Sequence, residues 1–394
     1  MKSGIDRRQF LKLMGTSFLS LLLNQCGIRP TPLVAPTPTI PVSPFPSPTA
    51  TAEPSLTPAP PSTSTPQPTV TPDFRATAAI GRVKTYDLPQ LRREMQNMLD
   101  QLGGLADVIR PGARVVIKPN LTGNTWSDDK LPAPSTEMFV THPALVQVLI
   151  ELLLDAGAGK ISIVEGLGDE AIFKAWGYSE VAAFTNASLV DLCKPAPYKD
   201  YVPFPVGAGR QIYDVLYMNA VMREVDVFIS VAKMKCHSTT GVTLSLKNLV
   251  GLPPVSLYRD DEKHNHRSSF HESTIYDTRL PRVVVDLNLA MPVHLAIVDG
   301  IRTVEGAAGV WDKGYNPVQP GLLVASKNAL AADAVSTALM GFEPDASAGA
   351  SPFGYADNHL VLAREAGLGT NRMNEIGIVG GEIAEAVFPF KAAR

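Results

Sequence analysis

The sequence predicts an α/β fold of the Rossmann-like type, with a mostly parallel central sheet, helices on both faces and loop excursions. From Asp73 onward, short β-branched runs alternate with longer helical stretches, as they do where crossover helices join parallel strands. Roughly 320 residues follow that point, and 45% of the whole sequence is apolar. That length suits one large domain, or two lobes sharing an interface, with a substantial core.

The helices are predicted from apolar spacing and from end signals. Leu91, Met95 and Met98 recur at helical spacing and predict a helix over residues 88–105. Pro143 in the first turn and Gly157 just past the end predict a helix over residues 143–156. Further helices are expected, in chain order, over 171–176, 180–185, 241–249, 282–290, 329–340 and 359–365.

The strands are predicted from short apolar or β-branched runs between these helices. They are expected over residues 114–118, 161–165, 211–218, 225–232, 294–298, 321–325 and 375–379. A charged segment over 258–272 lacks periodicity and is expected to be an excursion over a surface. Its residues His264, His266 and His271 could supply metal ligands, although we favour a solvated loop for them.

Two zones precede this domain, which we place at residues 73–394. Residues 1–26 are expected to be a twin-arginine-type signal segment, because Arg7 and Arg8 precede an apolar run over 13–23 that is too short to cross a bilayer as a helix. Residues 27–72 are expected to be a disordered linker rich in Pro, Thr and Ser. Of the 34 prolines, 15 lie from Pro30 to Pro72, where Glu53 is the only charged residue.

The apolar run ends in Leu23-Asn24-Gln25-Cys26, which is similar to a bacterial lipoprotein signal. Cys26 is therefore predicted as a lipidation site, although Gln25 departs from the small residue usual at that position. The alternatives are a signal cut nearby and an uncleaved anchor. We expect export by the twin-arginine route and an extracytoplasmic location, with attachment to the cell membrane through the N-terminal segment.

Charge and cysteine content exclude some functions. The 35 basic and 38 acidic residues give a formal charge of −3, and a phosphate backbone demands a basic surplus, so we expect no nucleic-acid partner. The sequence contains no Cys-x-x-Cys, which excludes a self-contained iron–sulfur or zinc-ribbon motif. Any divalent metal would need His, Asp or Glu ligands.

Functional side chains follow four of the predicted strands. In an open parallel sheet, ligands bind at the carboxyl ends of the strands, so these residues are expected to share one pocket. In chain order they are Lys118 and Asn120, then Glu165, then Lys233, Lys235 and His237, then Asp299 followed by Glu305. The alternative is that strands commonly end in polar loops.

The segment from Val231 to Gly251 carries the most functional groups. It places Lys233, Lys235, His237, Thr239 and Thr240 before a predicted helix that begins at residue 241, with Lys247 and Asn248 further along. A helix N-terminus beside hydroxyl and ammonium groups makes an anion cradle suited to carboxylate or phosphate. Alternatively, Thr240 caps the helix and the lysines stay solvated.

Several motifs together resemble one known family. They are Ile117-Lys118-Pro119-Asn120-Leu121, Thr141-His142-Pro143, Asp155-Ala156-Gly157, the Lys-Met-Lys-Cys-His segment with Lys247-Asn248, and Asp299-Gly300 with Glu305-Gly306. Their order and spacing resemble the family called domain of unknown function 362 (DUF362). The resemblance implies an α/β fold with recurrent Lys, Asn and His positions, and it implies no settled reaction.

Two hypotheses for the function follow. In the first, an exported enzyme binds an anionic small molecule, assisted by an unidentified cofactor or a divalent metal. Its expected catalytic residues are Glu165, Lys235, His237 and Asp299, and its expected metal ligands are His237, Asp299 and Glu305. The expected ligand-binding residues are Lys118, Asn120, Lys233, Thr239, Thr240, Lys247 and Asn248. In the second, a surface lipoprotein captures a metabolite or metal without catalysis. Both leave the oligomeric state open.

Overall fold

An eight-stranded sheet forms the centre of the computed structural model, which describes residues 74–123, 130–272 and 275–393. The strand order is β14-β1-β13-β10-β7-β2-β3-β4. The strands are β1 (Ala76–Arg82), β2 (Arg114–Pro119), β3 (Lys160–Glu165), β4 (Ser188–Asp191), β7 (Val227–Lys233), β10 (Leu295–Gly300), β13 (Leu322–Ser326) and β14 (Ile376–Val379). The expected signal segment, linker and lipidation site at Cys26 lie outside the described residues.

The sheet is mostly parallel, which confirms the predicted fold class. Strands β10, β7, β2, β3 and β4 run parallel to one another, and so do β1 and β14. Strand β13 is antiparallel to both β1 and β10. The chain between β10 and β13 forms a hairpin of β11 (Thr303–Glu305) and β12 (Asn316–Val318), with no crossover helix to return it in the parallel direction.

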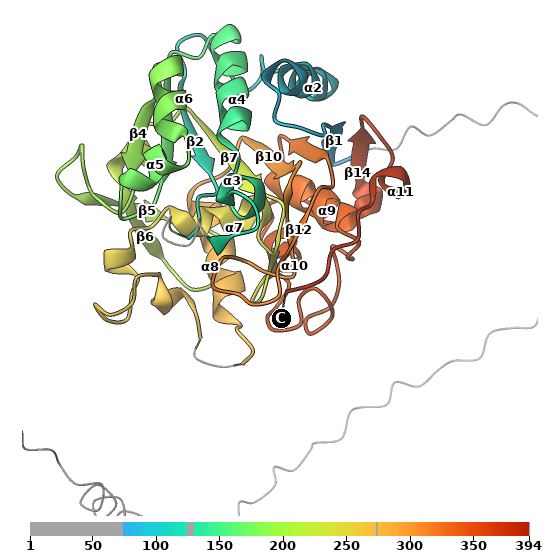
Figure 1. Ribbon diagram of the computed structural model, residues 1–394. Helices are drawn as coiled ribbons and strands as arrows, with labels where there is room; N and C mark the ends of the chain where they lie inside the picture. Colours follow the sequence, from blue (N-terminus) through green and yellow to red (C-terminus); the bar gives the residue numbers. More distant parts are fainter. Residues whose placement is uncertain (1–73, 124–129, 273–274, 394) are drawn as a thin grey trace, which may run out of the picture. The chain divides into compact units, whose positions relative to one another are not determined.

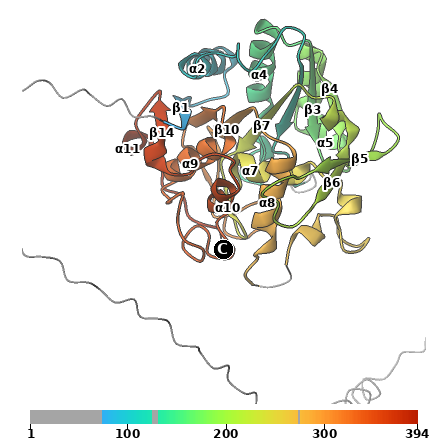
Figure 2. The same ribbon diagram turned by 180° about the vertical axis from the view of Figure 1, so that it is seen from behind.

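Helices cover both faces of the sheet, as Figures 1 and 2 show from opposite sides. One layer holds α2 (Leu88–Gln101), α4 (Pro143–Asp155), α5 (Ala171–Ala175) and α6 (Tyr178–Thr185). The other holds α7 (Leu244–Asn248), α8 (Arg279–Ala290), α9 (Ala329–Leu339) and α10 (His359–Glu365). Two further short helices are α3 (Ser135–Met138) and α11 (Ile383–Ala386). None of the described helices is long and apolar enough to span a membrane.

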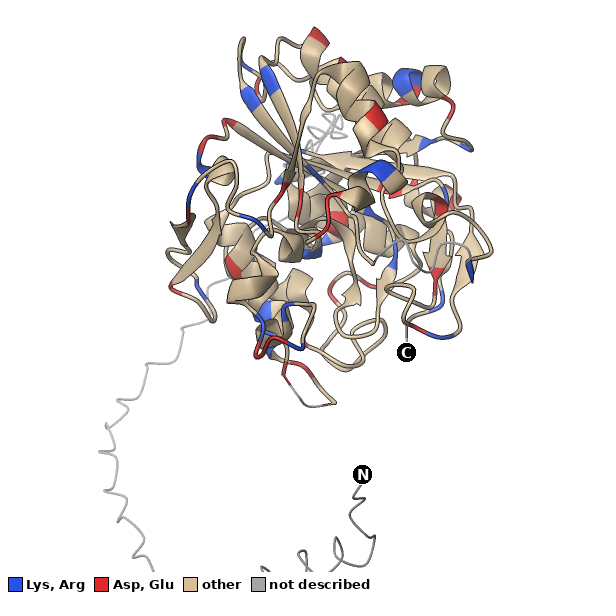
Figure 3. Ribbon diagram, turned by 60° about the vertical axis from the view of Figure 1, so that its left-hand side comes forward, with Lys and Arg blue, Asp and Glu red and all other residues tan. Residues whose placement is uncertain are grey.

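The alternating strand residues explain the two layers. Ile229 and Val231 of β7 pack with the α4 layer, whereas Phe228 packs with the α8 layer. Helix α4 begins at Pro143, as its sequence predicts, and Gly157 follows its end with φ +99°. Positive and negative residues are interspersed over the ribbon (Figure 3), in keeping with the small net charge.

The sequence prediction differs from the structure at several strands and at one helix start. The sequence prediction misses β1, β4, β5 (Tyr201–Pro205) and the small hairpin of β8 (Cys236–His237) with β9 (Gly241–Val242). The strand expected over 211–218 is β6 (Val215–Asn219), because the N–H groups of residues 211–213 bond the Asp286 carboxylate instead of a strand. The helix expected to begin at residue 241 begins at Leu244.

Candidate functional site

The first polar centre is a buried ion pair between the ends of β2 and β3. The Lys118 Nζ lies 2.7 Å from Glu165 Oε1 and 2.8 Å from Oε2, and both side chains are almost fully buried. Lys118 also donates to Asn248 Oδ1 of α7, which accepts a second hydrogen bond from Asn120 Nδ2. Burial lowers the pKa of Lys118, and the Glu165 carboxylate opposes that shift.

The second polar centre joins the ends of β7 and β10. The Lys233 Nζ lies 2.9 Å from Asp299 Oδ2, and neither side chain has solvent exposure. Asp299 also accepts hydrogen bonds from the Tyr86 hydroxyl (2.9 Å) and the His142 backbone N–H (3.1 Å). Burial, followed by the Asp299 charge, raises the pKa of Tyr86 well above its usual value, so its hydroxyl stays protonated.

These centres share one edge of the sheet but lie on opposite faces of it. Lys118 points to the same side of β2 as Val116, which packs in the α8 layer. Lys233 points to the same side of β7 as Val231, which packs in the α4 layer. Lys118 is in register with Ser230, three residues before Lys233, and an odd separation reverses the face. The structure thus divides the expected common pocket into two ion pairs.

One segment crosses the sheet edge between the two ion pairs. The Thr141 hydroxyl donates to the Val231 carbonyl of β7 (2.7 Å) and accepts the N–H of Asn120 after β2 (2.9 Å). The next residue, His142, donates its N–H to Asp299. Phe139 accepts a hydrogen bond from Lys235 Nζ at its carbonyl (2.8 Å). Residues 139–142 therefore connect both centres through hydrogen bonds.

Three cationic side chains that act on one another electrostatically form no ion pair with a carboxylate of the described residues: Lys235, Lys247 and Arg267, which we call the cationic cluster. Lys235 is 1% exposed and has the Phe139 carbonyl as its partner. Arg267 donates to the carbonyls of Gly251 (3.0 Å) and Pro253 (2.6 Å). Lys247 and Arg267 remain partly exposed, which leaves the cluster accessible from solvent.

The members of the cationic cluster repel one another. Burial, followed by the charges of Lys247 and Lys233, lowers the pKa of Lys235 well below its usual value. Burial, followed by the charges of Lys118 and Arg267, lowers the pKa of Lys247 to about 7. Both shifts show that burial and the neighbouring positive charges disfavour the protonated forms of Lys235 and Lys247.

The anion cradle expected at residue 241 does not form. Helix α7 begins at Leu244, which turns the chain with φ +47°. The buried Asp333 carboxyl group accepts the N–H groups of Ser245 (2.7 Å) and Leu246 (2.8 Å), so a protein side chain already occupies the helix end. The Thr240 hydroxyl donates to the Val242 carbonyl instead of capping the helix.

His237 is the last residue of β8, just before the β8–β9 turn. Its Nδ1 accepts the N–H groups of Thr239 (3.1 Å) and Thr240 (3.3 Å). Burial, followed by the charge of Lys247, lowers the pKa of His237 well below its usual value, so the ring is neutral and carries its proton on Nε2. His237 is therefore a hydrogen-bond donor and a poor proton source at neutral pH.

The expected metal ligands do not come together. Within the part of the chain that the structure describes, no three His, Cys, Asp or Glu side chains could hold a metal ion. Asp299 is bound to Lys233, and Glu305 bonds Asn316 Nδ2 and the Lys391 N–H. The rings of His264 and His266 lie 5.3 Å apart and those of His266 and His271 6.3 Å, without forming such a group.

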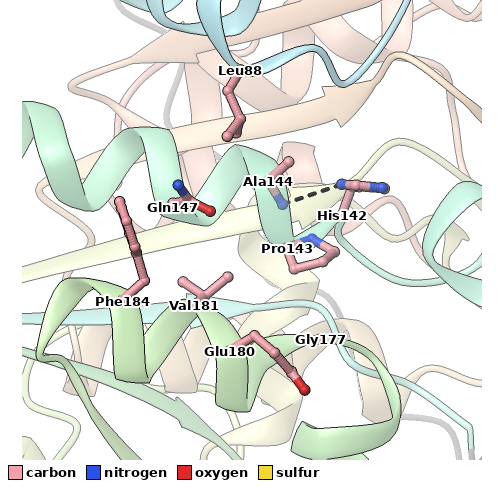
Figure 4. A pocket seen from close by; sticks show the side chains of 9 residues that line it. All are labelled: Leu88, His142, Pro143, Ala144, Gln147, Gly177, Glu180, Val181 and Phe184. Carbon is pink, nitrogen blue, oxygen red and sulfur yellow. Dashed lines mark hydrogen bonds between the residues drawn. The ribbon is translucent and has the colours of Figure 1, made fainter.

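A shallow hollow of about 370 Å³ borders the second centre at the start of α4 (Figure 4). His142 stands at one end, with Nδ1 accepting the Ala144 N–H. Its ring stacks on Tyr86 at 3.7 Å. Burial is the main cause that lowers the pKa of His142 to about 4. The rest of the lining is largely apolar and ends at Phe184, which is 72% exposed.

Comparison with known proteins identifies the family. The model of the domain of unknown function DUF362 matches residues 115–338, more than half of the chain. The chain belongs to the DUF362 family. Over 266 residues it is 27% identical to a thylakoid-associated protein of Synechocystis sp., covering 67% of this chain and 74% of that protein.

Two solved structures resemble parts of this DUF362 protein. One is the lactate racemase apoprotein of Thermoanaerobacterium thermosaccharolyticum, with a TM-score of 0.34 and 13% identity over 59% of this chain and 52% of that one. The other is a protein from Thermotoga maritima, with a TM-score of 0.34 and 9% identity over 62% of this chain and 56% of that one. The matched region thus spans little more than half of either structure.

Three residues of the DUF362 site were missed by the sequence prediction, whereas Thr141 belongs to one of the family motifs. Arg267 was assigned to a solvated loop, and its contact with Gly251 depends on tertiary packing. Tyr86 reaches the site from a distant part of the chain, without a local signal. Asp333 did have a signal, because a lone carboxylate in the apolar run of α9 needs a buried partner.

Proposed function

We propose that this DUF362 protein binds an anionic small molecule at the cationic cluster. The observation that carries the proposal is that Lys235, Lys247 and Arg267 have no carboxylate partner among the described residues. Burying an uncompensated charge is costly, and a bound anion offsets that cost. A carboxylate or phosphate ligand fits, because both accept charge-assisted hydrogen bonds from ammonium and guanidinium groups.

The geometry favours binding over catalysis. The two expected catalytic carboxylates, Glu165 and Asp299, are held in buried ion pairs and surrounded by donors. His237 is a neutral donor, and Lys235 is enclosed beside the Phe139 carbonyl. A general acid or base must reach its substrate in the right protonation state, and none of these four groups meets both conditions. The non-catalytic hypothesis therefore becomes our proposal.

Inorganic phosphate is a suitable first probe, measured by isothermal titration calorimetry on the full chain. Lys247→Met removes the partly exposed charge and keeps the side-chain length. We expect phosphate binding to weaken about tenfold or more, because a hydrogen bond to a charged group is lost. Lys160→Met is the control, since Lys160 is exposed at the opposite edge of the sheet. Equal phosphate affinity in Lys247→Met and wild type would refute the proposal.

We also propose that the protein is exported by the twin-arginine route and held at a membrane surface. The support is the Arg7-Arg8 pair, the short apolar run and Cys26 in the sequence. The thylakoid association named for the Synechocystis relative agrees with membrane attachment. Mass spectrometry of the mature N-terminus tests this: a lipid-modified Cys26 supports tethering, and an unprocessed Met1 in cytoplasm contradicts export.

A further inference from the structure

Helices α2, α4 and α6 form one layer over the sheet, with α4 in the middle (Figure 1). We call the outer side of this layer the three-helix face. The outward residues of α4 recur at helical spacing and none of them is buried: Ala144, Gln147, Glu151 and Leu154. The hollow described above opens at the start of α4, where Ala144 contributes only a methyl group and all three helices contribute lining residues.

The hollow has apolar walls that stay in contact with water. Leu88 of α2 stands on one side, and Val181 and Phe184 of α6 stand on the other (Figure 4). Leu88 is 38% exposed and Phe184 is 72% exposed. Because most of the Phe184 side chain is exposed, it contributes little to the packing of α6 on α4. Covering these walls with a bulky apolar side chain would remove their surface from water, which is favourable.

The charged side chains on and beside α4 are mainly acidic. Arg92 of α2 pairs with both Glu151 (3.1 Å between Nη1 and Oε2) and Asp155 of α4. Glu180 of α6 lines the hollow and has no ion pair among the described residues. These three carboxylates and one guanidinium leave a net charge of −2. Gln147 donates its Nε2 to Glu151 Oε1 (3.1 Å), which leaves its own Oε1 as a hydrogen-bond acceptor at the hollow. A partner with positive charge and hydrogen-bond donors is complementary to this surface.

The shape of the three-helix face suits a helix better than an extended chain. Its middle is the ridged surface of α4, whose 13 residues span about 20 Å. The side chains of a second helix pack between such ridges, and its positions i, i+3, i+4 and i+7 can carry apolar anchors. Residues on the flanks of that helix reach the walls of the hollow, where a Lys or Arg can pair with Glu180.

We propose that the three-helix face binds a basic amphipathic helix of another protein. A bulky apolar residue of that helix enters the hollow between Leu88 and Phe184, and a Lys or Arg beside it pairs with Glu180. The inference goes beyond the proposed anion binding and does not depend on it, because Lys247 belongs to α7 in the opposite layer. An anionic membrane surface is a poor alternative, because the acidic side chains would repel it.

The test measures the binding of two fluorescein-labelled peptides to the full chain by fluorescence anisotropy. The basic peptide has two repeats of Leu-Lys-Lys-Leu-Leu-Lys-Leu, which form an amphipathic helix, and the acidic peptide has Glu in place of each Lys. We expect the basic peptide to bind about tenfold more tightly than the acidic one. Phe184→Ser removes an apolar wall and Glu180→Lys reverses the charge at the hollow. Each should weaken binding of the basic peptide about fivefold or more.

A matched control separates this face from exposed apolar surface in general. Leu257 is 50% exposed and lies outside the three-helix face, so Leu257→Ser should bind the basic peptide as wild type does. Phe184→Ser should melt near the wild-type temperature, because the replaced ring is mostly exposed. Hydrogen exchange should slow in residues 143–155 and 178–185 when the basic peptide is added.

Three outcomes would overturn the inference. They are equal affinity of the two peptides for wild type, equal affinity of Phe184→Ser and wild type for the basic peptide, and binding of hexylamine at the hollow without binding of the basic peptide. The last result would make the occupant a small amine. Failure of phosphate to bind would refute the proposed function alone, since neither peptide binding nor its loss in Phe184→Ser depends on the cationic cluster.

Discussion

Breaking the Lys118–Glu165 pair should be among the most destabilising single changes in the domain. In Glu165→Gln the neutral amide replaces a carboxylate that lies 2.7–2.8 Å from Lys118 Nζ. The carboxylate also accepts the N–H groups of Leu121 (2.9 Å) and Gly166 (3.0 Å), and the new NH₂ group would face one of those donors. Removing one partner of a buried pair costs about 3–5 kcal/mol.

That cost corresponds to a measurable change in melting temperature. A folded region of roughly 320 residues has an unfolding entropy near 0.7 kcal/mol/K, so the expected fall in Tm is about 4–7 °C. Differential scanning calorimetry and urea unfolding measure both quantities. Asp226→Asn, which breaks the exposed pair with Arg114, is the control and should leave Tm nearly unchanged.

The same reasoning predicts that replacing both partners is far milder than replacing one. The double variant Lys118→Met with Glu165→Leu leaves no uncompensated charge, and buried pairs replaced by apolar residues are often neutral or stabilising. Its Tm should exceed that of Glu165→Gln. If Glu165→Gln instead melted within about 1 °C of wild type, the pair would carry little of the structure and the reasoning would be refuted.

Three further predictions concern neighbouring groups. Gly251→Ala should destabilise the domain, seen as a lower Tm, because the new Cβ would clash with the Glu165 carboxylate. Burial raises the pKa of Asp333 to about 8, so the folded state holds a proton that the unfolded state loses near pH 4. The contribution of Asp333 to the free energy of unfolding should therefore fall as the pH rises from about 4 to about 8. Urea unfolding should show a flatter pH profile in Asp333→Asn. Sulfate should bind more tightly below pH 7 than above, because Lys247 is charged below its pKa of about 7; calorimetry on Lys247→Met should lose that dependence.

The sequence predicted the layers of the fold better than the site. Long periodic segments such as α4, and buried runs such as β7, follow from apolar spacing and end residues alone. The sequence could not show that Lys118 and Lys233 lie on opposite faces of the sheet. Their relative orientation depends on the register of β2 with β7. Register is a property of paired strands and has no local signal.

The predicted start of α7 was wrong for a different reason. Thr239, Thr240 and Gly241 are typical of a helix N-terminus, but a short hairpin and the positive φ of Leu244 take that place. The competing partner is Asp333, about ninety positions later in the chain. Tertiary hydrogen bonding therefore overrode the local preference.

Residues 139–142, which cross the sheet edge between the two ion pairs, couple the structures of those pairs. Thr141 anchors this segment to β7 and to the chain after β2, and His142 anchors it to Asp299. A substitution that displaces this backbone disturbs both faces of the sheet at once. Substitutions in the two ion pairs should therefore change the free energy of unfolding in a non-additive way. A redesign of either ion pair would therefore have to keep residues 139–142 and the other ion pair in place.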